Sequence, residues 1–434
     1  MLHYYLVLGM RSLRRHPVLT MLMVLTLAVG VAASVATLTI LHVMSSDPIP
    51  DKSGRLFTVL LDNGPRAGYV PGKRPPSAIS YRDASALLAS GQGQRRTAVY
   101  GISANVQPPR RDLAARRVAG MATSGDFFAM FDTPFRSGQA WSADDDSRGA
   151  DVVVLGRALA DKMFGTADPL GQRLVLSGQS YQVVGVLDTW APLPRYYYLF
   201  GGRPGPDGDQ FFIPFNNAIR HQRQPESVGC SGSYGTGFQA LLGSECFFIQ
   251  FWLEAVSTRE REPLQQYVDH YADEQRRLGR MARQAPNLLL DVRQFLAHRN
   301  VVGDDNKVTA WLAFGFLLLC LVNTIGLLLA KFNGRAGEVG VRRALGASQR
   351  AIFQQLLVET GVIGLAGGVL GLLFALTALA LIGLQSAQLG VAAHMDWSML
   401  LLTIGMAVGT ALLAGLLPAW RACRMAPARH LKSH

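Results

Sequence analysis

Charged side chains are scarce in this sequence, since only 17% of its 434 residues are Asp, Glu, Lys or Arg, against about 25% in an ordinary soluble domain. Hydrophobic residues make up 49% of the chain. Together these two figures indicate that part of the chain lies in lipid. Cysteine is also scarce, and four Cys exclude a small scaffold held together by disulfides.

Common catalytic and nucleotide-binding motifs are absent as well. The sequence has no Gly-x-Ser-x-Gly elbow and no His-Glu-x-x-His, and its nine His are scattered. Its single Gly-Lys pair, Gly72-Lys73, is followed by Arg74 where a phosphate-binding loop needs Ser or Thr. We therefore expect a chain that is not an enzyme, with no catalytic residues, no metal site and no cofactor. Any ATP-driven work would need another protein.

Four apolar stretches are each long enough to cross a membrane, which takes about 20 residues. We predict spanning helices at residues 18–44, 308–330, 356–384 and 397–420. Glu359, at the cytoplasmic entry of the third stretch, is the only charged residue in them. The alternative, four helices buried in a soluble core, would need unusually long runs without charge.

Charges inside a helix bundle mark the paths of ions and solutes, so we expect no substrate path through these helices. Asn323 and Thr324 are expected to form hydrogen bonds between helices rather than a proton relay. Small residues in the third stretch should allow close helix packing: Gly364, Gly367, Gly368 and Gly371.

Basic residues predict which side of the membrane faces the cytoplasm. They flank the spans on one side only: Arg11, Arg14, Arg15, Lys331, Arg335, Arg342, Arg343, Arg350, Arg421, Arg424, Arg429 and Lys432. By the positive-inside rule, residues 1–17, 331–355 and 421–434 are cytoplasmic, and residues 45–307 and 385–396 are external. Both termini are then cytoplasmic, and the first segment is expected to form an amphipathic helix on the inner surface.

Topology also accounts for most of the net charge of +12. Residues 45–307 carry 30 basic and 27 acidic residues, so most of the basic excess flanks the spans. We therefore expect membrane lipid, and no nucleic acid, as the partner of the basic residues.

The first apolar run has a second interpretation. With Arg14 and Arg15 before it, it resembles a secretory signal peptide that has a loose cleavage site at residues 33–36. The run from residue 18 to residue 43 is 26 residues long, whereas the apolar part of a signal peptide has about 7–15 residues. An uncleaved anchor is therefore favoured.

The external segment mixes strand and helix patterns, which predicts an α+β domain. We expect a helix at residues 77–88 and a hairpin that turns at Ser177-Gly178. The stretch 190–243, rich in Gly and Pro, is predicted to be mostly loop with one short strand at residues 211–214.

Two of the four Cys, Cys230 and Cys246, lie in the external segment on either side of a Gly- and Ser-rich loop. Outside the cytoplasm such a pair can oxidise, and we predict a disulfide between them, with two unrelated thiols as the alternative. Cys320 and Cys423 fall in the second span and the cytoplasmic tail, so neither can join this bond.

The loop from Arg335 to Ser348 has the pattern of a short helix. Glu338 and Arg342 are spaced i,i+4 in the favourable order. Gly346 is a natural helix C-cap, and the serine that follows can cap the next helix.

One face of this short helix is apolar, since Val341, Ala344 and Leu345 lie together at helical spacing. A docking helix and a plain connecting turn on the lipid surface fit the pattern equally well. Arg335 lies further from the helix and is expected to matter little for docking. The candidate docking residues are Glu338, Val341, Arg342, Arg343, Ala344, Leu345 and Gly346.

The same loop, with several other segments in matching order, resembles the MacB/FtsX family of ABC-transporter permeases, whose loops run close to Arg-x-x-Glu-Ile-Gly-Ile-Arg-Arg-Ala-Leu-Gly-Ala. The resemblance covers nearly the whole chain. It is carried by residues 11–17, 124–131, 138–141, 152–165, 168–171, 181–186, 335–348, 417–422 and 426–427.

This resemblance implies four spanning helices and a large α+β periplasmic domain of two subdomains between helices 1 and 2, in the bacterial inner membrane. A discontinuous porter-like subdomain is expected at about 45–135 and 245–300, with a second subdomain inserted at about 136–244. Two permeases, identical or paralogous, would pair and bind a dimer of ABC ATPases. Because no ATPase domain is fused here, the ATPase is expected to be a separate chain, coupled through the loop at 335–348.

Two functions follow from the resemblance. The first is export of a peptide, an antibiotic or a lipid-linked substrate, with a periplasmic adaptor and an outer-membrane channel. In such an export system, ATP hydrolysis would be converted into movement of the periplasmic domain. The alternative is a regulator that transmits the same movement to a periplasmic partner, such as a cell-wall hydrolase, without transport. The size of the external domain favours export. A membrane-anchored binding module without an ATPase is a weaker third possibility.

Overall fold

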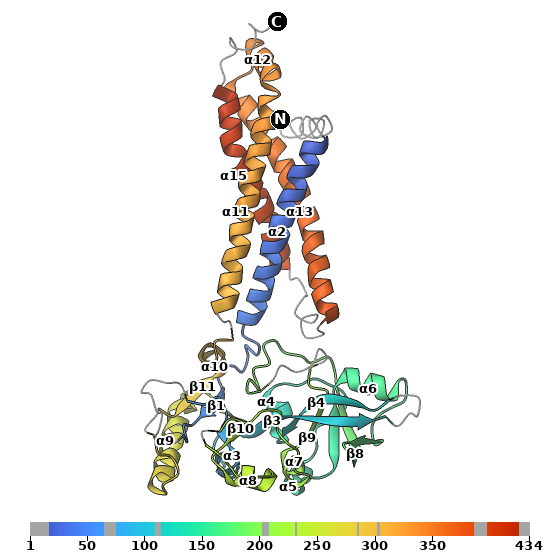
Figure 1. The fold of residues 1–434 in the computed structure, drawn as a ribbon, viewed down its shortest axis with the longest axis vertical. Coiled ribbons are helices and arrows are strands. Elements are labelled where there is room, and N and C mark those ends of the chain that lie inside the picture. The colour runs from blue at the N-terminus through green and yellow to red at the C-terminus, as the bar shows by residue number, and fades with distance from the viewer. Residues whose placement is uncertain are drawn as a thin grey trace. The chain divides into compact units, whose positions relative to one another are not determined.

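The structure is a computed structural model that describes residues 17–64, 75–108, 114–201, 208–230, 232–283, 286–301, 304–385 and 397–424. The predicted N-terminal amphipathic helix up to residue 16, residues 386–396 of the external loop and residues 425–434 of the C-terminal tail fall outside these residues. Two compact units are present, one made of long helices and one, residues 46–301, built around a β-sheet (Figure 1).

Four long helices make up the first unit: α2 (Pro17–Ser45), α11 (Asp304–Asn333), α13 (Gln349–Gln385) and α15 (Trp397–Arg424). Each contains a stretch long and apolar enough to cross a membrane, which confirms the four predicted spans. A short helix, α12 (Ala336–Ala344), lies between α11 and α13 in the sequence.

Glycines of α13 bring this helix close to two neighbours. A Cβ atom on Gly364 would lie 2.5 Å from the Ala411 Cβ of α15. On the α2 side, a Cβ on Gly367 would lie 3.0 Å from the Leu27 Cβ. The predicted close packing of these small residues is confirmed. The expectation for Thr324 is wrong, because its hydroxyl donates to the Cys320 carbonyl of its own helix at 2.8 Å.

The second unit contains an eleven-stranded sheet, whose main path has the order β11-β1-β10-β3-β4-β9-β6-β8-β5. Two further strands pair beside this path, β2 with β10, and β7 with β3 and β8. The strands are β1 (Leu56–Leu60), β2 (Ile79–Ser80), β3 (Arg95–Gln107), β4 (Arg116–Thr123), β5 (Phe135–Gly138), β6 (Val152–Leu155), β7 (Arg173–Leu176), β8 (Gln179–Leu187), β9 (Phe211–Pro214), β10 (Phe247–Glu254) and β11 (Leu288–Asp291).

The parallel pairing of β4 with β9 holds the two halves of the sheet together, with Met121 opposite Phe212. β4 ends a set of strands from both ends of the domain sequence, whereas β9 begins a set that lies between residues 135 and 214. Gly120 permits this contact, because a Cβ on it would lie 2.5 Å from the Phe211 ring. A continuous sheet therefore joins segments that are distant in the sequence.

Short helices connect and cover the strands: α3 (Tyr81–Ala89), α4 (Asp126–Met130), α5 (Ala143–Arg148), α6 (Arg157–Phe164), α7 (Phe215–Arg220), α8 (Phe238–Gly243), η1 (Thr258–Glu260), α9 (Arg261–Arg277) and α10 (Val292–His298). Two expectations need correction. The first helix begins at Tyr81 rather than residue 77, because the Ser80 side chain caps it by accepting from the Asp83 amide. The stretch 190–243 contains α7 and α8 in addition to the predicted strand.

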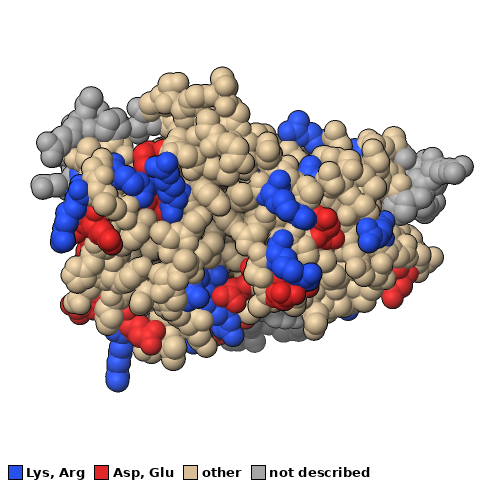
Figure 2. Space-filling view, turned by 90° about the horizontal axis from the view of Figure 1, so that it is seen from below, with Lys and Arg blue, Asp and Glu red and all other residues tan. Residues whose placement is uncertain are grey.

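The hairpin prediction is confirmed: β7 pairs with β8 around Ser177 and Gly178, both of which have positive φ. Aromatic side chains fill much of the core of this unit, and Phe127, Phe131 and Trp252 are fully buried in it. On the face drawn in Figure 2, basic side chains lie beside acidic ones and form no large patch of one sign.

The packing of α13 on α15 yields a stability prediction. Gly364→Val should lower the melting temperature in detergent, because overpacking a tight contact typically costs about 1–3 kcal/mol. Gly405→Val is the matched control, since a Cβ on Gly405 meets nothing within 4 Å. Equal melting temperatures for the two variants would contradict the tight contact.

Candidate functional site at the connector between α11 and α13

The connector, residues 334–348, folds as the sequence predicts. The amide of Ala347 donates to the Arg342 carbonyl and that of Gly346 to the Arg343 carbonyl, at 3.0 and 3.1 Å. Gly346 has a φ of +98°, so the pair forms the left-handed end that favours glycine. The Ser348 hydroxyl then accepts from the amide of Ala351 at 3.2 Å and caps α13.

The two faces of α12 have different surroundings. Val339 packs against the cluster of buried side chains that includes Phe332 and Ile352. Val341 and Leu345, one turn apart, are 56% and 83% exposed. The Ala344 side chain is not among those described. α12 is therefore anchored on one face and presents an apolar pair on another.

Charged residues of α12 are bound toward the helix bundle. Glu338 Oε1 lies 2.6 Å from Arg342 Nη2, as the i,i+4 spacing predicts. Arg342 Nη1 also donates to Gln355 Oε1 of α13 at 3.0 Å. Arg343 Nη1 donates to the Cys423 carbonyl of α15 at 3.2 Å. These side chains help to fix α12 on the helices beside it.

The most buried charged side chains lie beside the connector, on α11 and α13, and the sequence did not predict that they form a group. Lys331 Nζ of α11 lies 2.6 Å from Glu359 Oε1 of α13, and both side chains are almost completely buried. Arg335 Nη1 lies 3.0 Å from Glu359 Oε2, while Arg335 Nε contacts Glu338 at 3.1 Å. We name these three residues, Lys331, Arg335 and Glu359, the junction cluster.

Arg335 therefore has a different place from the one expected. It is the N-cap residue of α12 and is nearly buried, rather than lying apart from the helix. Burial alone would lower the pKa of Arg335, but the Glu338 and Glu359 carboxylates outweigh it and raise the pKa above its usual value. It is thus unsuitable as an inert control. The signal in the sequence was Glu359, the only acid in the third span.

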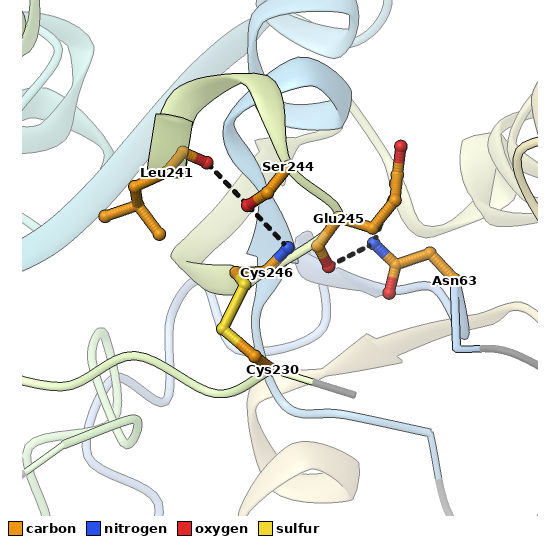
Figure 3. Close-up of a disulfide and its surroundings, with 6 residues drawn as sticks. All are labelled: Asn63, Cys230, Leu241, Ser244, Glu245 and Cys246. Atoms are coloured by element: carbon orange, nitrogen blue, oxygen red, sulfur yellow. Dashed lines mark hydrogen bonds between the residues drawn. A yellow bond between two sulfur atoms is a disulfide. The ribbon is translucent and has the colours of Figure 1, made fainter. Parts of the chain in front are cut away.

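The unit of residues 46–301, built around the β-sheet, is called the soluble unit below. In it, Cys230 and Cys246 form the predicted disulfide, with an S–S distance of 2.07 Å (Figure 3). The Ser244 hydroxyl donates to the Leu241 carbonyl and accepts from the Cys246 amide. The Asn63 side chain donates to the neighbouring Glu245 carbonyl at 3.0 Å. These bonds fix the chain at the start of β10, where the disulfide attaches the loop before it.

Within the described part of the chain, no three or more His, Cys, Asp or Glu side chains gather in a way that could hold a metal ion. The connector combines an exposed apolar pair, Val341 and Leu345, with buried charges beside it, and we take it as the candidate functional site.

The disulfide yields a stability prediction. Cys230→Ala/Cys246→Ala should lower the free energy of unfolding by about 3 kcal/mol, because a closed loop of roughly 15 residues restricts the unfolded chain by that amount. Urea denaturation of the full chain in detergent measures this change. A reductant should lower the stability of the wild type and leave the variant unchanged. A reductant effect of equal size on both proteins would contradict the bond.

Two family models match the chain. That of the MacB-like periplasmic core domain matches residues 20–268, and that of the FtsX-like permease C-terminal region matches residues 310–427. The connector lies inside the second match.

Relatives of known name show the same likeness. The macrolide export ATP-binding/permease protein MacB of Azoarcus sp. (strain BH72) is 26% identical over 98% of this chain and 58% of its own length. The pyoverdine export ATP-binding/permease protein PvdT of Pseudomonas entomophila (strain L48) is 25% identical over 95% of this chain and 57% of its own length. The chain thus spans somewhat more than half the length of these curated relatives.

Among solved structures, the periplasmic region of MacB from Actinobacillus actinomycetemcomitans aligns with 59% of this chain and 96% of its own chain. The two are 12% identical, with a TM-score of 0.36.

Proposed function

Because the chain belongs to the family with a MacB-like periplasmic core domain and an FtsX-like permease region, we propose that it is the permease subunit of an ABC-type export system. It is a multi-pass protein of the inner membrane. In this proposal both termini and the connector face the cytoplasm, as the basic flanks of the spans favour. The single observation that carries the proposal is the family match over both the periplasmic and the membrane regions.

The permease transmits work and does not perform catalysis. A separate ABC ATPase dimer hydrolyses ATP and moves the connectors of two paired permeases, either identical copies or paralogues. Spanning helices carry this movement to the periplasmic domain. The two relatives named above are export proteins for a macrolide and for pyoverdine. For this chain we propose an exported peptide, antibiotic or lipid-linked substrate, passed to a periplasmic adaptor and an outer-membrane channel.

The geometry of α12 supports its role as the docking element. Val341 and Leu345 project one turn apart from an anchored helix and together expose an apolar surface. A few anchor residues that fill a partner's pocket contribute most of the affinity of an interface. Arg342 and Arg343 already bind α13 and α15, and Glu338 binds Arg342 within α12. We propose that these three residues orient the helix and that Leu345 is its main anchor.

A reconstitution experiment tests the proposed function. The purified chain should not hydrolyse ATP by itself, and it should raise ATP turnover of its partner ABC ATPase when both are placed in liposomes. Cells that carry both proteins should export the substrate class and lose export with a catalytically inactive ATPase. ATP turnover by the chain alone, with contaminating ATPases excluded, would contradict the proposal. Coupled turnover without export, but with activation of a wall hydrolase, would favour the regulator.

Leu345→Asp tests the docking surface. Removing an anchor from such a contact typically costs about 2 kcal/mol, which is roughly a 30-fold loss of affinity. The variant should insert into the membrane and fail to co-purify with the ATPase. Leu278→Asp is the matched control, because Leu278 is 68% exposed in the soluble unit. Equal recovery of the ATPase with wild type and Leu345→Asp, at matched expression, would show that α12 is a plain connector.

A further inference from the structure

The junction cluster places three charges where three helices meet. Lys331 lies in the last turn of α11, Arg335 begins α12, and Glu359 lies in the third turn of α13. Exposed fractions of the Lys331 and Glu359 side chains are 0% and 1%. The two oxygens of one carboxylate are thus shared between cations from two other segments.

Partners in the cluster are unequally distributed. Within the described residues, Glu359 is the only acid that pairs with Lys331. Arg335 pairs with Glu359 through one arm of its guanidinium and with Glu338 of α12 through another. The planar guanidinium has several donors in fixed directions, so it can hold both carboxylates at once. Glu359 is therefore the anion through which both α11 and α12 are bound to α13.

Stability alone does not account for such a cluster. Taking charges out of water is costly, and well-packed apolar side chains of similar volume are often equally stable or more stable. An ionisable residue within a spanning stretch, as Glu359 is, is rare and marks a functional position. An ion pair with bonds in fixed directions differs from an apolar contact in that it allows little sliding or rotation.

We propose that the junction cluster makes α12 move as one body with α11 and α13, so that a displacement of α12 reaches both spanning helices. Arg335 and Glu359 are positioning residues in this proposal, because they act through α12 and do not contact the ATPase. The inference rests on the proposed function, in which the ATPase displaces α12. It predicts that binding of the ATPase and coupling to it can be separated.

Arg335→Met separates them. Methionine keeps an unbranched side chain and removes the contact with Glu359, while the buried pair of Lys331 and Glu359 stays intact. In liposomes with the partner ABC ATPase, affinity for the ATPase should change less than two-fold, whereas the stimulated turnover should fall by about five-fold or more. Arg335→Lys, which keeps a cation beside Glu359, should give intermediate stimulation.

Controls identify the cause of any loss. Arg421→Met removes an exposed arginine at the end of α15 and should behave as the wild type. Melting temperatures in detergent should agree between the Arg335→Met and Arg421→Met variants. A loss of ATPase binding that accompanies the loss of stimulation would assign Arg335 a merely structural role and overturn the inference.

A distance measurement tests the junction without the ATPase. Spin labels at Leu345→Cys and Leu365→Cys, both exposed positions, report the distance between α12 and α13 when Cys320 and Cys423 are replaced by Ala. The distribution should be narrow with Arg335 and broad with Arg335→Met. Equally narrow distributions, or full stimulation by Arg335→Met, would overturn the inference alone. Failure of the wild-type chain to bind the ATPase would overturn the proposed function and this inference with it.

Discussion

The unit of the four long helices depends most on the ion pairs that the buried Glu359 carboxylate forms. Glu359 is the only acid in the third apolar stretch, and it neutralises Lys331, whose side chain is completely buried. Without Glu359, Lys331 would keep a charge in a region that offers it no other described acid, which is one of the costliest changes that a single substitution can make. The same carboxylate also binds Arg335, so one side chain connects the last turn of α11 and the N-cap residue of α12 to α13.

The two units solve the packing problem by different means. In lipid there is little hydrophobic gain from bringing apolar helices together, so close backbone contact has to supply the attraction. Gly364 and Gly367 provide that contact on two sides of α13. In the soluble unit, burial of large aromatic side chains supplies the attraction between packed elements. Phe127 and Trp252, both fully buried, are examples of such side chains.

Features that depend on neighbours in the sequence were predictable. The four spans follow from the length of the apolar stretches. The C-terminal end of α12 follows from Gly346, the start of α13 from Ser348, and the hairpin from Ser177 and Gly178. The disulfide followed from topology and needed no knowledge of the fold. Features that depend on distant neighbours were missed. The pairing of Lys331 with Glu359 joins residues on two helices separated by the connector, and no local pattern encodes the distance between them.

The buried charges beside α12 hold this helix in place and so fix the position of the exposed pair, Val341 and Leu345. Apolar contacts have no preferred direction, whereas ion pairs and hydrogen bonds of charged groups add geometric specificity. α12 is bound at its first residue to Glu359 and near its last residues to α13 and α15, through Arg342 and Arg343. In the proposed function, contacts at both ends of α12 would make it move together with its neighbours when the ATPase displaces Leu345. An element that is exposed on one face and held by directional bonds on the other is therefore suited to passing a displacement onward rather than absorbing it.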